Sequence, residues 1–571
     1  MKKRYKWRNI ADKIARYIIS IGGIGTILAL LLVFLFLLNT TLPLFESGKI
    51  SDSKSQLFPT SIDFKHGILD EYGVVGIVFD GKSFLGFSTI GGEVIRKKDV
   101  SKGVVNSFSY NPKDDTYLLA DKSGISEVSI GIRNEIVKSG VPTGNPSYSV
   151  SDSKVIEIDG DAESFYSVEM SVEKIIDITG KEILLVDGVK SENSRILAFL
   201  TEDKILHMDY LTFKENILTG EITSEVEEHY INLESKLTQD FPKYIKLNST
   251  STTVMIFFED SRYLSFDLRD LNDIKLLEDK KLFNDRKITY LEMLNGRNTV
   301  LIGDDKGFVT TWWPVDRGAI SQELVKNHEF YGGSDKPIKF ISSSKRDKSF
   351  LVLTEDNVFS MFYMTSEKKL FHEKIDNFNG RIVAINGKNS KISVIGDEKF
   401  YTYDVEIPHP EATAKSIFGK VVYELGAKPE YVWQSSSGSD EFEPKFSLVP
   451  LIFGTIKATI IAMLFAVPLA IMGAVYTSEF LNKKFRSSIK SSVEIMASLP
   501  SVVLGFIAAL IVSPFVENVV LGLICSVIMV PWVTLFVGNL FQLTPKGLLL
   551  VLSRYRFLLV TFISLPLGVY I

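Results

Sequence analysis

The sequence predicts a mixed membrane protein, in which all-α transmembrane helices are combined with an all-β extracytoplasmic propeller of seven or eight blades. Three observations lead to this fold class. Long apolar runs stand near both ends of the 571-residue chain, charged residues concentrate between them, and a strand–turn–strand pattern recurs through the middle. A net charge of -5 provides no basic surface for nucleic acid, and a single cysteine excludes an internal disulfide framework.

The first apolar run, residues 17–38, contains 22 consecutive uncharged residues, about the length that crosses a bilayer. Seven lysines and arginines precede it against one aspartate, so we expect residues 1–16 to be a basic cytoplasmic terminus. A signal peptide would have a shorter apolar core followed by small residues, whereas "NTTLPLFESG" follows here. We therefore predict an uncleaved transmembrane helix within residues 17–44.

The middle segment, residues 45–410, repeats a unit of apolar strand, acidic or glycine turn, and second strand. Seven copies start at residues 74, 117, 196, 253, 299, 350 and 392. Most starts are 42–57 residues apart, and one gap of 79 leaves room for a degenerate copy near "VIEIDGDAESFYSVEM". Such a period with several strands per unit is typical of a β-propeller. No carboxylates or histidines cluster at catalytic spacing, so we interpret the propeller as a binding or docking module. Trp312 and Trp313 could form a ligand platform, but we expect them to be packed between blades.

A linker over residues 411–446 precedes a second apolar region, residues 447–571. The expected helices lie at about 448–476, 493–512, 519–541 and 557–571. Lysines and arginines follow the first and third of these helices, whereas the turn "SPFVEN" has none, so both ends of the chain point to the same cytoplasmic side. By this topology the propeller lies outside the cytoplasm. The last run has only 15 residues, short of the roughly 20 that a span requires.

Two stretches of this region carry a resemblance to a known family. The run from "YVWQSSSG" to "AVYTSEF" and the following "IKSSVEIMASLPSVVLGF" resemble the C-type permease subunit of Pst phosphate uptake systems, which are bacterial ABC importers. The resemblance is to the subgroup with a large domain inserted after the first helix. It implies a type-1 ABC permease fold in the bacterial inner membrane, with the propeller in the periplasm.

The resemblance also implies partners: a cytoplasmic ATPase, a second permease subunit, an extracytoplasmic phosphate-binding protein and membrane lipid, with no cofactor and no nucleic acid. The one match to G-x-x-x-x-G-K-[ST], residues 76–83, lies inside a strand–turn–strand repeat and not between a strand and a helix, so the chain is expected not to be an enzyme and to leave ATP hydrolysis to a separate subunit. The family's coupling loop, which docks onto the ATPase, has no match between residues 477 and 571. We therefore expect a truncated or split form.

Three residues are candidates for the substrate pathway: Thr455, Lys457 and Ser501. Lys457 would lie about 13 Å deep if the span begins at Leu448, since a helix rises 1.5 Å per residue. A lysine at that depth is costly and usually faces a cavity or a partner, where it would attract an anion. The alternative is a later membrane entry, with Lys457 reaching back to the surface.

A second group, Glu494, Pro500 and Gly505, is predicted to set the shape of the third helix and its gating. Proline removes a helical hydrogen bond, and Ser501 and Gly505 allow close helix contact. Glu494 either pairs locally with Lys490, four residues earlier, or helps to seat the coupling region. The competing function is a membrane-anchored propeller acting as a receptor or assembly scaffold without transport, for which such polar and helix-breaking residues would be unnecessary.

Overall fold

The computed structural model describes most of the chain, which divides into two compact units, residues 1–455 and 456–571. The described residues are 2–51, 53–58, 63–101, 103–178, 181–191, 193–215, 222–237, 241–316, 322–438, 441–499, 501–542, 562–564, 566 and 567.

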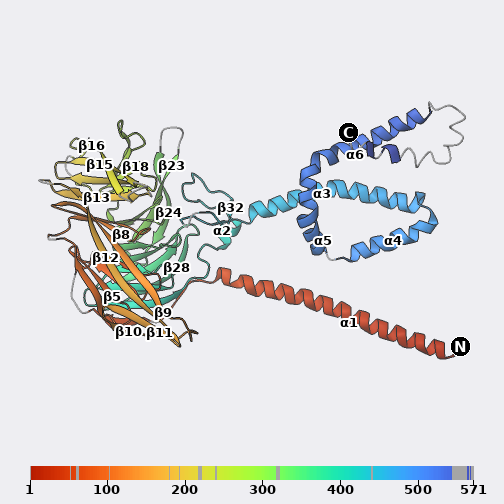
Figure 1. The fold of residues 1–571 in the computed structure, drawn as a ribbon, viewed down its shortest axis with the longest axis horizontal. Coiled ribbons are helices and arrows are strands. Elements are labelled where there is room, and N and C mark those ends of the chain that lie inside the picture. Colours follow the sequence, from red (N-terminus) through yellow and green to blue (C-terminus); the bar gives the residue numbers. More distant parts are fainter. Residues whose placement is uncertain are drawn as a thin grey trace. The chain divides into compact units, whose positions relative to one another are not determined.

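Seven antiparallel sheets form the blades of a propeller in the first unit (Figure 1). The first blade comprises β3 (His66–Leu69), β4 (Val75–Phe79), β5 (Ser83–Ser88) and β6 (Val94–Asp99). The second comprises β7 (Ser107–Asn111), β8 (Thr116–Asp121), β9 (Gly124–Lys138) and β12 (Ala162–Asp177), extended by β10 (Ser147–Ser151) and β11 (Lys154–Asp159). The third comprises β13 (Ile183–Lys190), β14 (Ser194–Thr201), β15 (Ile205–Glu215) and β16 (Ile222–Asn232).

The remaining blades follow in chain order. The fourth comprises β17 (Tyr244–Leu247), β18 (Thr253–Phe257), β19 (Arg262–Asp267) and β20 (Lys275–Lys281). The fifth comprises β21 (Ile288–Met293), β22 (Val300–Asp304), β23 (Phe308–Asp316) and β24 (Gln322–Tyr331). The sixth comprises β25 (Ile338–Ser343), β26 (Ser349–Thr354), β27 (Val358–Tyr363) and β28 (Lys368–Lys374). The seventh comprises β29 (Gly380–Ile385), β30 (Lys391–Gly396) and β31 (Lys399–Glu406), completed by β1 (Lys49–Ile50) and β2 (Lys54–Leu57).

The seven repeats found in the sequence are the hairpins between the second and third strands of the blades. In the first blade, the Asp80 carboxylate accepts hydrogen bonds from the backbone N–H groups of Lys82 at 2.7 Å and Ser83 at 2.6 Å. The acidic residue therefore holds the tight turn, as aspartate commonly does in turns. The second strands β4 and β26 are buried along their whole length, so they read as continuous apolar runs.

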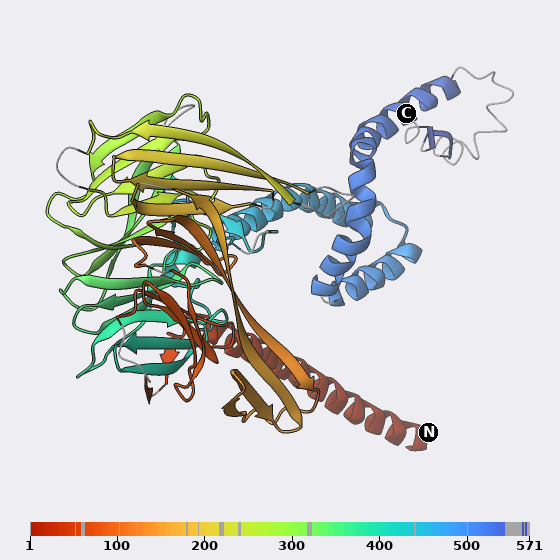
Figure 2. The same cartoon turned by 60° about the vertical axis from the view of Figure 1, so that its left-hand side comes forward.

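Of the two blade counts that the sequence left open, seven is confirmed, and the degenerate copy is not a separate blade. Residues 155–170 form β11 and most of β12, and β12 pairs with β9 of the second blade rather than starting another sheet. Figure 2 shows this long, orange-coloured extension projecting from the blades. The gap of 79 residues in the repeat is thus filled by two unusually long strands and an added hairpin within one blade.

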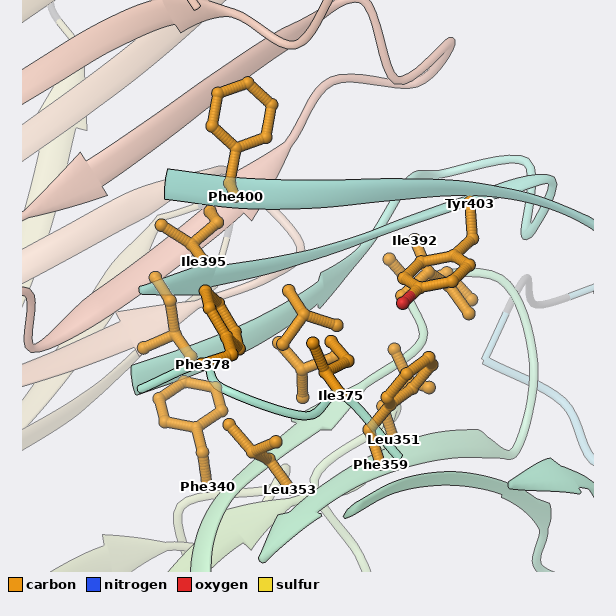
Figure 3. Close-up of a cluster of buried hydrophobic side chains, with 14 of the residues drawn as sticks. Phe340, Leu351, Leu353, Phe359, Ile375, Phe378, Ile392, Ile395, Phe400 and Tyr403 are labelled. Carbon is orange, nitrogen blue, oxygen red and sulfur yellow. The ribbon is translucent and has the colours of Figure 1, made fainter. Parts of the chain in front are cut away.

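The ring is closed by the amino-terminal strands. β1 and β2 precede the first blade in sequence yet pair antiparallel with β31, with Lys49 opposite Glu406. One apolar and aromatic cluster joins the seventh blade to both of its neighbours and includes Phe340 and Phe359 of the sixth blade and Phe400 of the seventh (Figure 3). The Phe400 ring centroid lies 5.2 Å from that of Phe87 in the first blade. The amino-terminal segment thus supplies the outer strand of the seventh blade, and the ring of blades closes with only short outer edges.

A segment after the propeller packs back onto it. Helix α2 (Ala414–Phe418) begins with a capping box, in which the Thr413 hydroxyl accepts the Ser416 N–H at 3.0 Å. Residues 421–447, which we call the strap, follow α2 and include the paired strands β32 (Trp433–Gln434) and β33 (Lys445–Phe446).

The helices lie on both sides of the propeller in sequence. They are α1 (Lys2–Thr41), η1 (Leu42–Phe45), α3 (Val449–Val475), the π-helical turn η2 (Tyr476–Phe480), α4 (Lys483–Ser498), α5 (Ser501–Ile507), the π-helical turn η3 (Ala508–Val512) and α6 (Ser513–Gln542). Three segments are long and apolar enough to span a bilayer: residues 13–45, 449–480 and 501–522. The first two contain the first two helices that the sequence predicted.

The third and fourth predicted helices need correction. Instead of a helix over 493–512, a turn at "SPFVEN" and a helix over 519–541, the structure has a break after α4 and then helical backbone from residue 501 to 542. Ser513 has φ -60° and ψ -48°, so the chain remains helical where the turn was expected. Pro514 is the second residue of α6, two residues after η3, where the i→i+4 ladder is already interrupted, so its missing N–H removes no regular bond. Most of the expected helix at 557–571 lies outside the described residues.

Candidate functional site

The predicted pathway residues Thr455 and Lys457 lie on α3. Thr455 donates a hydrogen bond from its hydroxyl to the backbone oxygen of Leu451 at 2.8 Å. Lys457 is exposed and makes no ion pair with any described residue. The apolar helical segment 449–480 has 32 residues, about 48 Å of helix, which exceeds a hydrocarbon core of about 30 Å. Lys457 is the ninth residue of α3, a position that is therefore compatible with both the pathway and the membrane interface.

The predicted gating residues are divided between two helices. Glu494 lies on α4, whereas Gly505 lies on α5 together with the predicted pathway residue Ser501. Pro500 lies outside the described residues, but α4 ends two residues before it and α5 begins directly after it. A Cβ added to Gly505 would have no atom within 4 Å, so this face of α5 is open for another helix.

A pocket of about 680 Å³ lies between the end of α3 with η2 and the helix α4. Small side chains such as Gly473 and Ala474 line one side, and Arg486, Lys490 and Glu494 lie on the other. In the part of the chain that the structure describes, no ion pair joins Lys490 to Glu494, although both line this pocket. The two helices are linked instead by the Arg486 guanidinium, which donates to the backbone oxygen of Ser478.

A larger pocket, of about 760 Å³, lies at one mouth of the propeller channel. It is lined by the turns between the first and second strands of the second to sixth blades, and by Gly438 and Glu441 of the strap. Four of the lining residues are cationic: Lys113, Lys190, Arg297 and Lys345. The mouth is thus a charged cavity built by many blades, the usual location of ligands in this fold class.

The channel below this mouth is filled by aromatic and neutral polar groups. The His66 imidazole lies 2.8 Å from the Tyr117 hydroxyl, and burial lowers the pKa of His66 to about 3. Burial also raises the pKa of Glu292, whose carboxylate accepts the Met293 N–H at 3.0 Å. His66 is thus a neutral imidazole near neutral pH, and Glu292 holds its proton more tightly than an exposed glutamate does.

The strap is fastened by buried charges that the sequence analysis did not identify. The Lys348 ammonium, fully buried, donates to Asn295 O at 2.6 Å and to Glu424 Oε2 at 2.7 Å. Thr299 donates to the other oxygen of Glu424 at 2.6 Å. Glu424 and Lys348 stand 76 residues apart, so no local pattern reveals the pair.

Further contacts hold the strap on the fifth and sixth blades. Glu443 Oε2 accepts the Glu424 N–H at 2.7 Å, and Thr365 donates to the other Glu443 oxygen. Burial raises the pKa of Glu443. The Trp313 indole donates to Gly426 O at 3.1 Å, so Trp313 is packed, as predicted, and adds a bond to the strap.

Comparisons with known proteins relate part of the chain to ABC permeases. The chain is 31% identical over 94 residues to the probable ABC transporter permease protein YqgH of Bacillus subtilis, covering 16% of this chain and 30% of that protein. It is 34% identical over 74 residues to the phosphate transport system permease protein PstC of Mesorhizobium japonicum, covering 13% and 23%. It is 33% identical over 73 residues to PstC 1 of Mycobacterium tuberculosis, covering 13% and 22%. The chain contains a permease-like region.

These matches span less than a third of the length of each of these three relatives. No family model matches the chain. Among solved structures, it is similar to the β-propeller domain of Myceliophthora thermophila Cps50 (Swd1), with 11% identity, TM-score 0.40 and coverage of 63% of this chain and 100% of that one. It is also similar to Chaetomium thermophilum Raptor, with 12% identity, TM-score 0.39 and coverage of 64% and 30%. The propeller assignment itself depends on the strand order of the seven sheets.

Proposed function

We propose that this chain is a transmembrane permease subunit of an ATP-driven phosphate importer of the bacterial inner membrane, with its propeller inserted in the periplasm between the first two membrane helices. The observation that carries the proposal is the similarity to PstC-type permeases. The interrupted helix at "SLPSVVLGF" supports it, because a plain anchor has no need of a break between α4 and α5. ATP hydrolysis belongs to a separate subunit, and a second permease subunit and a phosphate-binding protein complete the system.

In this proposal Lys457, with Thr455 and Ser501, contributes to the anion pathway, while Glu494, Pro500 and Gly505 shape the helices beside it. A lysine without an ion-pair partner in the described chain offers an ammonium that can attract an oxyanion as a point charge. Because an apolar helix tolerates a cation only where it gains a partner or water, Lys457 is the residue whose removal is most informative.

The test is phosphate uptake by the complete system. The permease that contains this sequence, with the coupling loop supplied on the same or on a separate chain, is co-expressed with its ATPase, second permease and binding-protein subunits in a strain lacking its own C-type permease, and radiolabelled phosphate uptake is measured. Lys457→Met should lower uptake at least tenfold with unchanged membrane insertion and assembly, whereas Lys457→Arg should retain more. Lys181→Met, which removes a lysine of a propeller ion pair, is the matched control and should transport normally.

Unchanged uptake in the methionine variant would place Lys457 at the membrane surface. Absence of ATP-dependent uptake by an assembled wild-type complex, with phosphate or competing oxyanions, would instead favour the membrane-anchored receptor or scaffold. The charged mouth of the propeller is the observation that supports that second function.

A further inference from the structure

The pocket at the mouth of the propeller has more cationic than anionic groups. Four of its lining residues are cations, whereas two, Asp115 and Glu441, are carboxylates. Each lining cation also has an ion-pair partner. The pairs are Lys113 with Glu441, Lys345 with Asp115, Arg297 with Asp187, and both Lys190 and Arg195 with Glu127. Lys190 Nζ lies 3.7 Å from a carboxylate that already binds the buried Arg195, so Lys190 carries the least compensated charge.

Arg297 supplies a second unsatisfied group. Its side chain is 10% exposed and its Nη2 donates to Asp187 and to Leu247 O, but its Nε has no partner among the described residues. Arg297 also has φ 53°, a left-handed conformation that few non-glycine residues adopt and that persists only where its surroundings hold it. Guanidinium and ammonium groups that converge on one cavity are suited to binding oxyanions.

One carboxylate at this mouth comes from the strap rather than from a blade. Glu441 Oε1 lies 3.1 Å from Lys113 Nζ, and the two side chains are 37% and 70% exposed. An exposed ion pair of this kind contributes little, so a soluble anion can compete with it. Glu441 also stands beside the turn of the fifth blade, since a Cβ on Gly296 would lie 3.4 Å from the Glu441 Cβ.

We propose that the mouth of the propeller binds a small oxyanion, and that the Glu441 carboxylate occupies part of this site until the oxyanion displaces it. The cavity of about 760 Å³ is large enough for a phosphate group with its water, or for the phosphate of a lipid head group. Displacement frees the part of the strap around Glu441, which we call its tip, from Lys113. The buried Lys348–Glu424 pair keeps the start of the strap attached to the sixth blade.

The strap connects this site to the first helix of the second apolar region. Ser447 N donates to Val432 O at 3.0 Å, Leu448 N donates to Ile417 O at 2.9 Å, and α3 starts at Val449. The strap tip and the hydrogen bonds that position the start of α3 therefore belong to one continuous segment, so release of the tip acts on the segment that leads into α3. This link deepens the proposed function, whereas binding at the mouth does not depend on transport.

The experiment measures binding and strap protection in the full-length chain purified in detergent. Equilibrium dialysis with radiolabelled inorganic phosphate gives the affinity, and hydrogen exchange reports on residues 436–444. Glu441→Gln should tighten phosphate binding by up to about fivefold, because it removes the internal competitor. Lys113→Gln should weaken phosphate binding several-fold. Lys281→Gln is the control and should leave the affinity unchanged, because Lys281 does not line the mouth and pairs with Asp260, at 3.2 Å, in the turn between the second and third strands of the fourth blade.

A second arm separates the two sources of the phosphate group. In nanodiscs of neutral lipid, added inorganic phosphate should speed exchange at the strap tip if the free anion is the ligand. Exchange that responds only to phosphatidic acid in the disc identifies a lipid head group. The proposal is overturned if neither ligand changes exchange, or if Glu441→Gln and Lys113→Gln shift the affinity in the same direction. Because the two substitutions carry opposite expectations, general damage to the fold cannot imitate the result.

Discussion

Replacement of Lys348 by methionine should release the strap. Methionine preserves the length and most of the volume of the side chain but removes the cation that donates to Glu424 Oε2 at 2.7 Å and Asn295 O at 2.6 Å. The side chains of Lys348 and Glu424 are 1% and 9% exposed, so the substitution would leave Glu424 as a buried carboxylate whose remaining side-chain donor is Thr299. Breaking a buried pair on one side costs about 3–5 kcal/mol, which corresponds to roughly a hundred- to several-thousandfold more frequent opening.

Hydrogen exchange followed by mass spectrometry measures this opening in strap peptides. The double variant Lys348→Met/Glu424→Leu should recover most of the protection, because it removes both charges together. Lys428→Met, an exposed lysine of the strap, is the control and should exchange like the wild type. If the single variant keeps wild-type protection, the buried pair does not hold the strap. If the double variant exchanges as fast as the single one, the cost does not come from the unpaired carboxylate.

Two other predictions concern the propeller. Burial, with Glu228 opposite on β16, raises the pKa of Asp209 to about 7, so the folded state holds a proton that the unfolded state releases above about pH 4. The free energy of unfolding of the propeller should therefore fall as the pH rises from about 4 to 7. Asp209→Asn should raise this free energy by about 1–2 kcal/mol at pH 8 and flatten its pH dependence, as measured by thermal unfolding scans. An unchanged pH profile in the variant would contradict the pKa assigned to Asp209. A cysteine at the exposed Ser149, with Cys525→Ser, should react with an impermeant thiol reagent in intact spheroplasts, and labelling only after lysis would reverse the proposed topology.

The propeller could be predicted from the sequence because its strongest signals are local. Turns such as the one at Asp80 sit between strands only a few residues apart, and each blade repeats them. Ring closure could not be predicted, since β1 is a two-residue strand whose partner, Glu406, lies more than 350 residues away. The second-blade extension resembled a further repeat because long strands obey the same alternation as short ones.

The candidate site was predictable to a smaller extent. The helix-breaking sequence around Pro500 correctly drew attention to a place where α4 ends and α5 begins. The helix ends predicted near residues 512 and 519 were wrong, because a proline such as Pro514 gives the same sequence signal whether the chain turns or remains helical. The strap pair Lys348–Glu424 and the cationic mouth join residues that only the closed ring brings together, so neither has a motif.

The chain enters and leaves the propeller at neighbouring points, near residues 46 and 409. The Lys368 ammonium donates to Glu46 O at 2.8 Å and to His409 O at 3.5 Å, just outside the strand pair that closes the ring. An insert whose two ends meet can be grafted into a loop of a host without changing the separation of the flanking segments. The entry and exit of the propeller therefore lie side by side, and because the strap is bonded to the fifth and sixth blades, any exchange of the propeller would have to include the strap.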